Sequence, residues 1–229
     1  VGVGLRDRAR PRAPALTAPA PVGPVPIDPV PIGPVLIGPV LIGAVCVYCG
    51  SSSGTNPAFS DVAVRMGRVL AAQGITLVYG GSSIGLMGLM ADAALAEGGR
   101  VVGVMPRGLF RREVAHTGLS DLIEVDSMHE RKLTMFELSS AYVALPGGIG
   151  TLEELTEVLS WAQLGLHDRP IVTVNVDGFW DPVHHLLRHA VEAELVRPAS
   201  LDLLLDVATP EEALAVLYRG FPGRPPPER

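Results

Sequence analysis

Residues 141–164 read AYVALPGGIGTLEELTEVLSWAQL. The stretch begins with a short apolar run, continues with Pro146 and three glycines, and ends with apolar residues spaced three and four apart. An uninterrupted apolar run is typical of a strand that is covered on both faces, and the later spacing is typical of an amphipathic helix. The stretch therefore predicts a buried strand, a tight glycine-rich turn and a helix that follows immediately.

The same strand–turn–helix unit recurs on both sides of this stretch. Apolar runs predict strands at residues 44–48, 75–79, 101–105, 122–125, 141–145, 171–174 and 201–205. Helical patterns cover residues 57–73, 86–97, 128–138, 151–164 and 180–192. Such alternation predicts an α/β fold: a single Rossmann-like, doubly wound, mainly parallel sheet with helices on both faces. Ligands in this architecture bind at the carboxyl ends of the strands.

The first 42 residues differ in composition from the rest of the chain. They contain an Arg-rich start and a five-residue repeat, PVPID, PVPIG, PVLIG, PVLIG, with seven prolines between Pro21 and Pro39. Each proline removes an N–H donor and restricts φ, so we expect no membrane-spanning helix there and no signal-peptide core. We predict a disordered Pro-rich tail at 1–42, one folded domain at 43–220, and a disordered C-terminal tail at 221–229.

The net charge and the cysteine content limit the function classes. A formal charge of −6 argues against nucleic acid as a partner, because phosphate-backbone binding needs a basic face. The two cysteines, Cys46 and Cys49, form a C-x-x-C, but they fall in a predicted strand, where positions three apart point to opposite faces. We therefore expect buried free thiols, which suits a reducing cytoplasm.

Two small-residue loops follow the first two predicted strands. The serine loop, residues 49–56, reads CGSSSGTN, and its Ser51 is a candidate ligand contact. An ordinary turn with Asn56 as N-cap fits the serine loop equally well. The GGSS motif, residues 79–88, reads YGGSSIGLMG, and we expect Gly80, Gly81 and Gly85 to expose a helix N-terminus to phosphate. Neither the G-x-G-x-x-G spacing nor a P-loop lysine is present, so close helix–sheet packing stays open as the alternative.

The most specific element is the PGG motif, residues 145–154, which reads LPGGIGTLEE. We expect amides at Gly147, Gly148 and Gly150 to bind an anion at the helix start, where the dipole also favours an ionised glutamate. Thr151-x-x-Glu154 also matches a capping box, which would explain these two residues without a ligand.

Residues 128–132, MHERK, open another predicted helix. Arg131 and Lys132 oppose the helix dipole at this end, which indicates an anionic partner. The alternative is a solvated face with Glu130 or Glu137 nearby.

Together, the GGSS motif, the MHERK segment and the PGG motif resemble the "lonely guy" phosphoribohydrolases, which are often mislabelled as lysine decarboxylases. The resemblance extends from about Gly43 to about Val207, while the Pro-rich tail has no counterpart. It implies hydrolysis of the N-glycosidic bond of N6-substituted adenosine 5′-monophosphates, which releases a free cytokinin base and ribose 5-phosphate. It also implies a homodimer and an enzyme that uses neither a cofactor nor a metal.

The resemblance implies specific roles for individual residues. Glu154 would stabilise an oxocarbenium-like ribose and activate water, assisted by Arg131. Lys132 and the amides of Gly148, Ile149, Gly150 and Thr151 would hold the nucleotide. Glu113 and Ser160 match further ligand-contact positions less closely.

Other functions remain as alternatives. A general nucleoside 5′-monophosphate glycosidase or a non-catalytic nucleotide carrier could use the same loops. A pyridoxal-phosphate decarboxylase is disfavoured, because the only lysine, Lys132, lies in a charged helix. His184, His185 and His189 lack a further ligand at zinc-enzyme spacing, so we predict no metal site.

Overall fold

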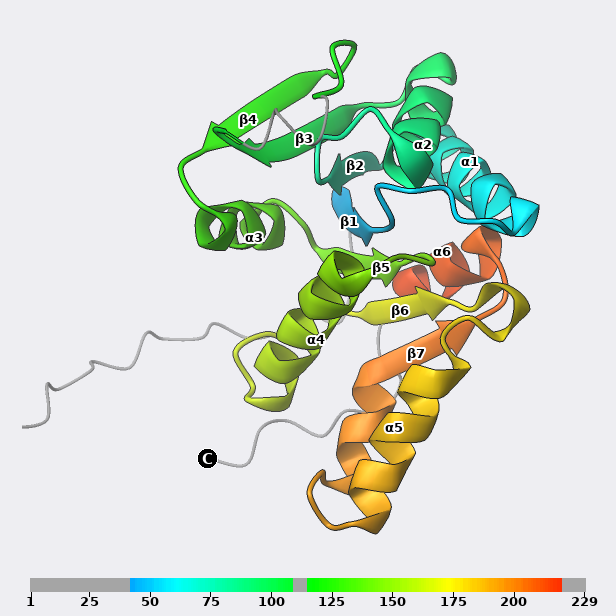
Figure 1. Cartoon of the computed structure of the whole chain (residues 1–229), viewed down its shortest axis with the longest axis vertical. Coiled ribbons are helices and arrows are strands. Elements are labelled where there is room, and N and C mark those ends of the chain that lie inside the picture. The colour runs from blue at the N-terminus through cyan, green and yellow to red at the C-terminus, as the bar shows by residue number, and fades with distance from the viewer. Residues whose placement is uncertain (1–41, 109–114, 220–229) are drawn as a thin grey trace, which may run out of the picture. The chain divides into compact units, whose positions relative to one another are not determined.

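The computed structural model describes residues 42–108 and 115–219 (Figure 1). Its centre is a seven-stranded sheet in the order β4-β3-β2-β1-β5-β6-β7, and every neighbouring pair of strands is parallel. The strands are β1 (Ala44–Tyr48), β2 (Thr76–Tyr79), β3 (Val101–Pro106), β4 (Asp121–Val125), β5 (Ala141–Ala144), β6 (Ile171–Val174) and β7 (Leu204–Val207). From β1 the chain winds outward in one direction to β4 and later in the other direction to β7, which confirms the predicted doubly wound α/β class.

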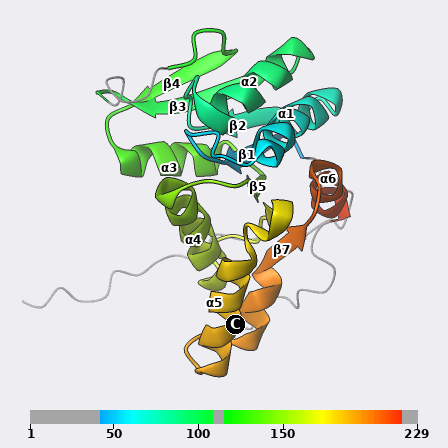
Figure 2. The same ribbon diagram turned by 45° about the vertical axis from the view of Figure 1, so that its right-hand side comes forward.

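Helices cover both faces of this sheet. They are α1 (Pro57–Ala72), α2 (Gly85–Ala96), α3 (Met128–Glu137), α4 (Ile149–Gln163), α5 (Asp181–Glu192) and α6 (Pro210–Arg219), with short 3-10 helices η2 (Val176–Gly178) and η3 (Pro198–Leu203). One core cluster joins the sheet to α1, α2 and α6, and a second cluster joins it to α3, α4 and α5. Figures 1 and 2 show α3 and α4 on the opposite side of the sheet from α1 and α2. The site described below draws on helices from both faces.

Side chains alternate between the two core clusters along each central strand. In β1, Val45 and Val47 pack with α1 and α2, whereas Cys46 and Tyr48 pack with α3 and α4. Cys49 belongs to the α1/α2 side, so the two sulfurs lie on opposite faces, as predicted, and both thiols are buried and free. The C-x-x-C is therefore a consequence of the strand pattern.

Two differences from the predicted elements occur near the C-terminus. The predicted strand at 201–205 is wrong in its first half, because residues Pro198–Leu203 form η3 and β7 starts only at Leu204. Helix α6, which begins with Pro210 after Thr209, was not among the predicted helices.

Several predictions lie outside the described residues. These are the two tails, apart from Ile42, and the candidate ligand residue Glu113. Within residues 42–108 and 115–219, no helix is both long and apolar enough to cross a bilayer.

Candidate active site

The candidate site lies where the sheet changes winding direction, between β1 and β5. The loops that leave β1 and β5 meet there, and the amide of Gly50 donates a hydrogen bond to the carbonyl oxygen of Pro146 at 3.2 Å. In open parallel sheets this switch point is the usual ligand crevice. The serine loop and the PGG motif therefore lie side by side, as the fold class predicts.

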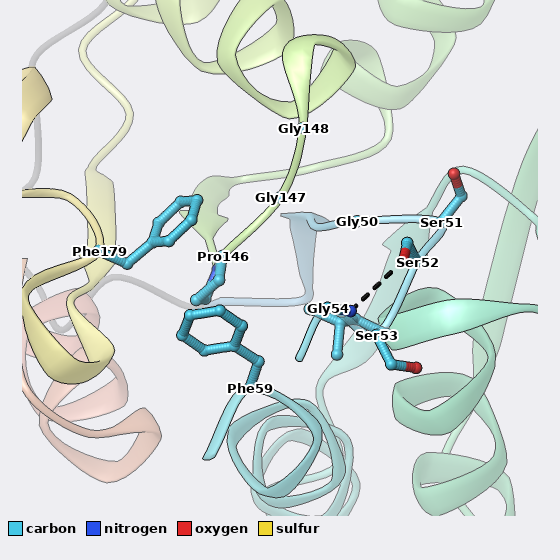
Figure 3. Close-up of a pocket in the computed structure, with 11 residues that line it drawn as sticks. Gly50, Ser51, Ser52, Ser53, Gly54, Phe59, Pro146, Gly147, Gly148 and Phe179 are labelled. Atoms are coloured by element: carbon cyan, nitrogen blue, oxygen red, sulfur yellow. Dashed lines mark hydrogen bonds between the residues drawn. The ribbon is translucent and has the colours of Figure 1, made fainter. Parts of the chain in front are cut away.

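A cavity of about 210 Å³ opens between these two loops (Figure 3). Its lining consists of backbone and hydroxyl groups of the serine loop, the turn of the PGG motif, and apolar side chains: Gly50, Ser51, Ser52, Ser53, Gly54, Pro146, Gly147, Gly148, Phe59, Leu86 and Phe179. Of the predicted site residues, the cavity brings together Ser51, Gly147 and Gly148.

Phe59 and Phe179 form an aromatic wall that the sequence analysis did not identify. Their rings meet edge to face at 5.4 Å between centroids, next to Pro146 in Figure 3. Asn56 connects the two segments that carry the rings. Its Oδ1 accepts from the amide of Ala58 at 3.0 Å, and its Nδ2 donates to Oδ2 of Asp177 at 2.8 Å. The predicted N-cap role of Asn56 is thus confirmed, and the same side chain also ties α1 to η2.

Glycines of the GGSS motif bring α2 close to the serine loop. A Cβ at Gly85 would lie 2.2 Å from the carbonyl carbon of Ser51, and Gly85 itself has a φ of +63°. The amide of Met87 donates to the carbonyl oxygen of Gly50 at 3.3 Å. Gly81 has a φ of +81° and faces Gly103 rather than the cavity. Packing therefore accounts for Gly81 and Gly85, and neither lines the cavity.

Arg131 occupies a buried and fully oriented position, with only 5% of the residue exposed. Its Nε donates to the carbonyl oxygen of Val104 and its Nη2 to that of Gly80, both at 3.1 Å. Gly80 is needed because a Cβ there would lie 2.0 Å from Nη2. The solvated-face alternative is therefore wrong for Arg131, which presents its remaining nitrogen, Nη1, toward α4.

Glu154 lies opposite that nitrogen, with Oε1 4.0 Å from Nη1 of Arg131. The glutamate is 8% exposed and belongs to the second turn of α4. Its negative charge acts on the buried Cys49, which directly follows β1. Burial raises the pKa of the Cys49 thiol, and the charge of Glu154 raises it further. A buried carboxylate and a buried guanidinium thus face each other near the N-terminus of α4.

The capping-box interpretation of Thr151 and Glu154 is wrong. Helix α4 begins two residues earlier than predicted, with Gly148 as N-cap, so Thr151 is its third residue. Thr151 is buried beneath the turn, where a Cβ at Gly147 would lie 2.1 Å from its Oγ1. Thr151 and Glu154 therefore do not form the predicted capping box at the start of α4.

The start of α4 is open to a ligand. The first helical bond that follows the N-cap runs from the amide of Leu152 to the carbonyl oxygen of Gly148, so the amides of Ile149, Gly150 and Thr151 have no intrahelical acceptor. A Cβ at Gly148 or Gly150 would meet nothing within 4 Å. Ile149 is 85% exposed.

Lys132 and Ser160 lie away from the cavity. The ammonium of Lys132 contacts the carboxylates of Glu153 and Glu157, the latter at 3.0 Å. Burial lowers the pKa of Lys132, but the hydrogen bonds and charges of the two glutamates outweigh this and leave the pKa raised. Ser160 is exposed, three turns along α4 from the helix start. The solvated-face alternative is also wrong for Lys132, since its partners are on α4 rather than Glu130 or Glu137.

The cavity and the charged pair draw on different helices. Phe59 and Leu86 come from α1 and α2, whereas Arg131 and Glu154 come from α3 and α4 on the other face of the sheet. The N-terminus of α4 lies between them and is common to both. Among the described residues, no three His, Cys, Asp or Glu side chains are grouped closely enough to hold a metal ion.

Solved structures share this fold. A molybdenum cofactor binding protein from Rippkaea orientalis matches with a TM-score of 0.58 and 20% identity, over 77% of this chain and 95% of that one. The molybdenum cofactor carrier protein of Chlamydomonas reinhardtii matches with a TM-score of 0.56 and 20% identity, over 75% and 93%. A structural-genomics target matches with a TM-score of 0.60 and 24% identity, over 77% and 98%. At these identities the similarity concerns the fold.

Sequence relatives are much closer. The protein-family model described as "Possible lysine decarboxylase" matches residues 87–217. A probable cytokinin riboside 5′-monophosphate phosphoribohydrolase of Oryza sativa subsp. japonica is 44% identical over 178 residues, which cover 78% of this chain and 73% of the relative. A cytokinin riboside 5′-monophosphate phosphoribohydrolase of Arabidopsis thaliana is 42% identical over 178 residues, which cover 78% and 83%. The chain therefore belongs to the cytokinin riboside 5′-monophosphate phosphoribohydrolase family, whose family model still carries the lysine decarboxylase label.

Proposed function

We propose that this chain hydrolyses the N-glycosidic bond of N6-substituted adenosine 5′-monophosphates, releasing the free base and ribose 5-phosphate. The names of its relatives supply the reaction class. One observation carries the proposal: the buried Glu154 carboxylate faces the fixed guanidinium of Arg131 at 4.0 Å, beside an open helix N-terminus. The predicted capping box does not account for this glutamate, because α4 begins after Gly148 and Thr151 is its third residue.

Glu154 supplies the charge that the reaction needs. As the bond from C1′ to the base nitrogen breaks, its electrons leave with the base and positive charge develops on the ribose. A fixed carboxylate next to C1′ stabilises that charge more strongly than it stabilises the neutral ground state. Glu154 also takes a proton from the attacking water, whose oxygen forms the new bond to C1′, and the departing base acquires a proton.

Arg131 orients this carboxylate. Two of its nitrogens are held by the carbonyl oxygens of Val104 and Gly80, so Nη1 has a defined direction. That nitrogen donates to a ribose oxygen of the substrate or to Glu154.

The 5′-phosphate binds at the start of α4. Amides of Gly148, Ile149, Gly150 and Thr151 and the positive end of the helix dipole favour an anion there. The serine loop, with Ser51, borders the same cavity and offers hydroxyl donors. A phosphate in this position leaves the ribose to extend toward Glu154.

We also propose that the enzyme works as a homodimer in the cytoplasm. Exposed apolar side chains on α3 and α4 support a partner surface, including Leu133, Ile149 and Leu164, with exposed fractions of 48%, 85% and 69%. The buried free thiols support a reducing compartment.

Incubation of the purified protein with AMP and with isopentenyl-adenosine monophosphate, followed by chromatography of the free base, tests the proposal. We expect base release, with preference for the N6-substituted nucleotide. Equal rates with unrelated nucleoside monophosphates would indicate a general glycosidase. Tight binding without base release would instead identify a nucleotide carrier and refute the proposed hydrolysis.

A further inference from the structure

Lys132 forms a bridge between two helices immediately next to the proposed catalytic pair. Its Nζ on α3 contacts the Oε1 atoms of both Glu153 and Glu157, which lie one turn apart on α4. Only 9% of the lysine side chain is exposed, and the side chain of Glu157 is 24% exposed. The side chain of Glu153 is 52% exposed, so the bridge has one surface partner and one partly buried partner. A lysine with little solvent contact and two carboxylate partners has fewer accessible positions than one in a fully solvated pair.

On both helices, the residues of the Lys132 bridge are next in sequence to the proposed catalytic pair. Arg131 precedes Lys132 on α3, and Glu154 follows Glu153 on α4. The Arg131–Glu154 contact and the Lys132–Glu153 contact therefore cross the same gap between the same two helices. Farther along, the rings of Phe136 and Trp161 meet at 4.9 Å and join the C-terminal ends of α3 and α4.

We infer that Lys132 is a positioning residue: by bridging Glu153 and Glu157 it fixes the N-terminal half of α4, and hence Glu154, against Arg131. This inference rests on the proposed function, because it concerns the geometry of the pair that performs the hydrolysis. It assigns Lys132 a role different from direct contact with the nucleotide.

Charge balance on α4 supports this role. Glu153, Glu154 and Glu157 put three carboxylates within two turns of the helix, and Glu153 and Glu157 are at i and i+4, where like charges repel. Lys132 offsets one of these two negative charges and contacts both carboxylates, while Arg131 faces Glu154. Without the lysine, the three carboxylates would compete for one guanidinium, and Glu154 would be displaced from its position.

The contacts of Lys132 also argue against its binding the phosphate. Its ammonium already contacts two carboxylates, and the residue is absent from the cavity lining beside the start of α4. A phosphate ligand at that position would have to displace both glutamates and would face their negative charge.

The test measures kcat and KM for base release from isopentenyl-adenosine monophosphate. Lys132→Met should lower kcat about 10- to 100-fold, as expected for a misplacement of about 1 Å, while KM changes less than about threefold. Lys132→Arg should restore most of kcat, because a guanidinium can also bridge two carboxylates. Arg65→Met is the matched control, since Arg65 pairs with Glu211 between α1 and α6 at 2.7 Å and is remote from the site; it should leave both constants unchanged.

A mutant cycle separates positioning from substrate binding. In a Glu153→Gln, Glu157→Gln background, adding Lys132→Met should have no further effect on kcat, because its partners are already gone. A phosphate-binding lysine would instead raise KM about tenfold or more in both backgrounds with kcat unchanged, and that result would overturn the inference. So would an unchanged kcat for Lys132→Met in an otherwise active protein. If the unaltered protein released no base, the proposed function and the inference that rests on it would both fall.

Discussion

A single methyl group at Gly80 should disable Arg131 without touching any ionisable residue. In Gly80→Ala the added Cβ would lie 2.0 Å from Nη2 of Arg131 and 3.1 Å from Sδ of Met87. Ordinary van der Waals contact begins near 3.4 Å, so the guanidinium must retreat by about 1.4 Å. The φ of Gly80 is not in the left-handed region, so the effect is steric rather than due to backbone strain.

A displacement of this size breaks the hydrogen bond from Nη2 to the Gly80 carbonyl oxygen, now 3.1 Å, and moves Nη1 relative to Glu154. The lost bond from a charged donor costs about 1.5–3 kcal/mol of folding stability. A misplacement of about 1 Å at a catalytic group costs on the order of 10² in kcat. Both effects should appear together in this variant.

Thermal unfolding and steady-state base release measure the two effects. Gly43→Ala is the control, because a Cβ at Gly43 meets nothing within 4 Å; it should leave melting temperature and kcat unchanged. If Gly80→Ala retained the unaltered kcat and melting temperature, the guanidinium would not need its described position, and the assignment of Arg131 to catalysis would be refuted.

Three further predictions concern thiols, phosphate and the PGG motif. Burial raises the pKa of both thiols, and the charge of Glu154 raises it further. Cys46 and Cys49 should therefore not react with a thiol reagent at pH 8 in the folded protein. We expect no thiol to be titrated in the native protein and two per chain to be titrated in urea. The nucleoside should have a kcat/KM at least about 10²-fold below that of its 5′-monophosphate. Equal values would refute the proposed phosphate site at the N-terminus of α4. Gly147→Ala, whose Cβ would lie 2.1 Å from Oγ1 of the buried Thr151, should destabilise the protein by about 1–3 kcal/mol in urea unfolding, whereas unchanged stability would mean that the turn can shift freely.

Most of the fold could be predicted because buried parallel strands leave a strong signal. The strands at 44–48 and 171–174 match the predicted bounds, since each is an apolar run that ends at turn residues. The last strand was placed three residues too early because Leu201 and Leu203 directly precede the leucines of β7. Apolar character alone does not separate the turns of a 3-10 helix from a strand.

The capping signature shows why helix starts were harder to predict. In Ser127-x-x-Glu130 and Thr209-x-x-Glu212, the glutamate amide donates a hydrogen bond to the hydroxyl oxygen, at 3.1 and 3.2 Å. Thr151-x-x-Glu154 has the same pattern but does not form it, because Gly148 already begins α4. Only the geometry of the preceding turn distinguishes a capping glutamate from a glutamate with the same spacing that lies inside the helix, such as the proposed catalytic Glu154.

The tertiary partners of the site could not be predicted from local patterns. Phe179 contacts Phe59 in the cavity wall although the two residues are 120 positions apart in the chain. Lys132 contacts glutamates that belong to another helix. Such contacts depend on which helices share a face of the sheet. The candidate residues Arg131 and Glu154 were identifiable because their motifs lie at strand ends, where the fold class gathers ligands.

The role of the Glu154 charge is tested by comparing base release from isopentenyl-adenosine monophosphate by Glu154→Gln and Glu153→Gln. The two residues are adjacent on α4, but Glu154 is buried beside Arg131 while Glu153 pairs with Lys132 at the helix surface. Circular dichroism and nucleotide binding should confirm that both variants fold and bind. We expect Glu154→Gln to lose about 10²–10⁴ in kcat with the nucleotide still bound, and Glu153→Gln to lose at most a few-fold. A Glu154→Gln variant that releases base at the unaltered rate, or a Glu153→Gln variant that is the inactive one, would contradict this account.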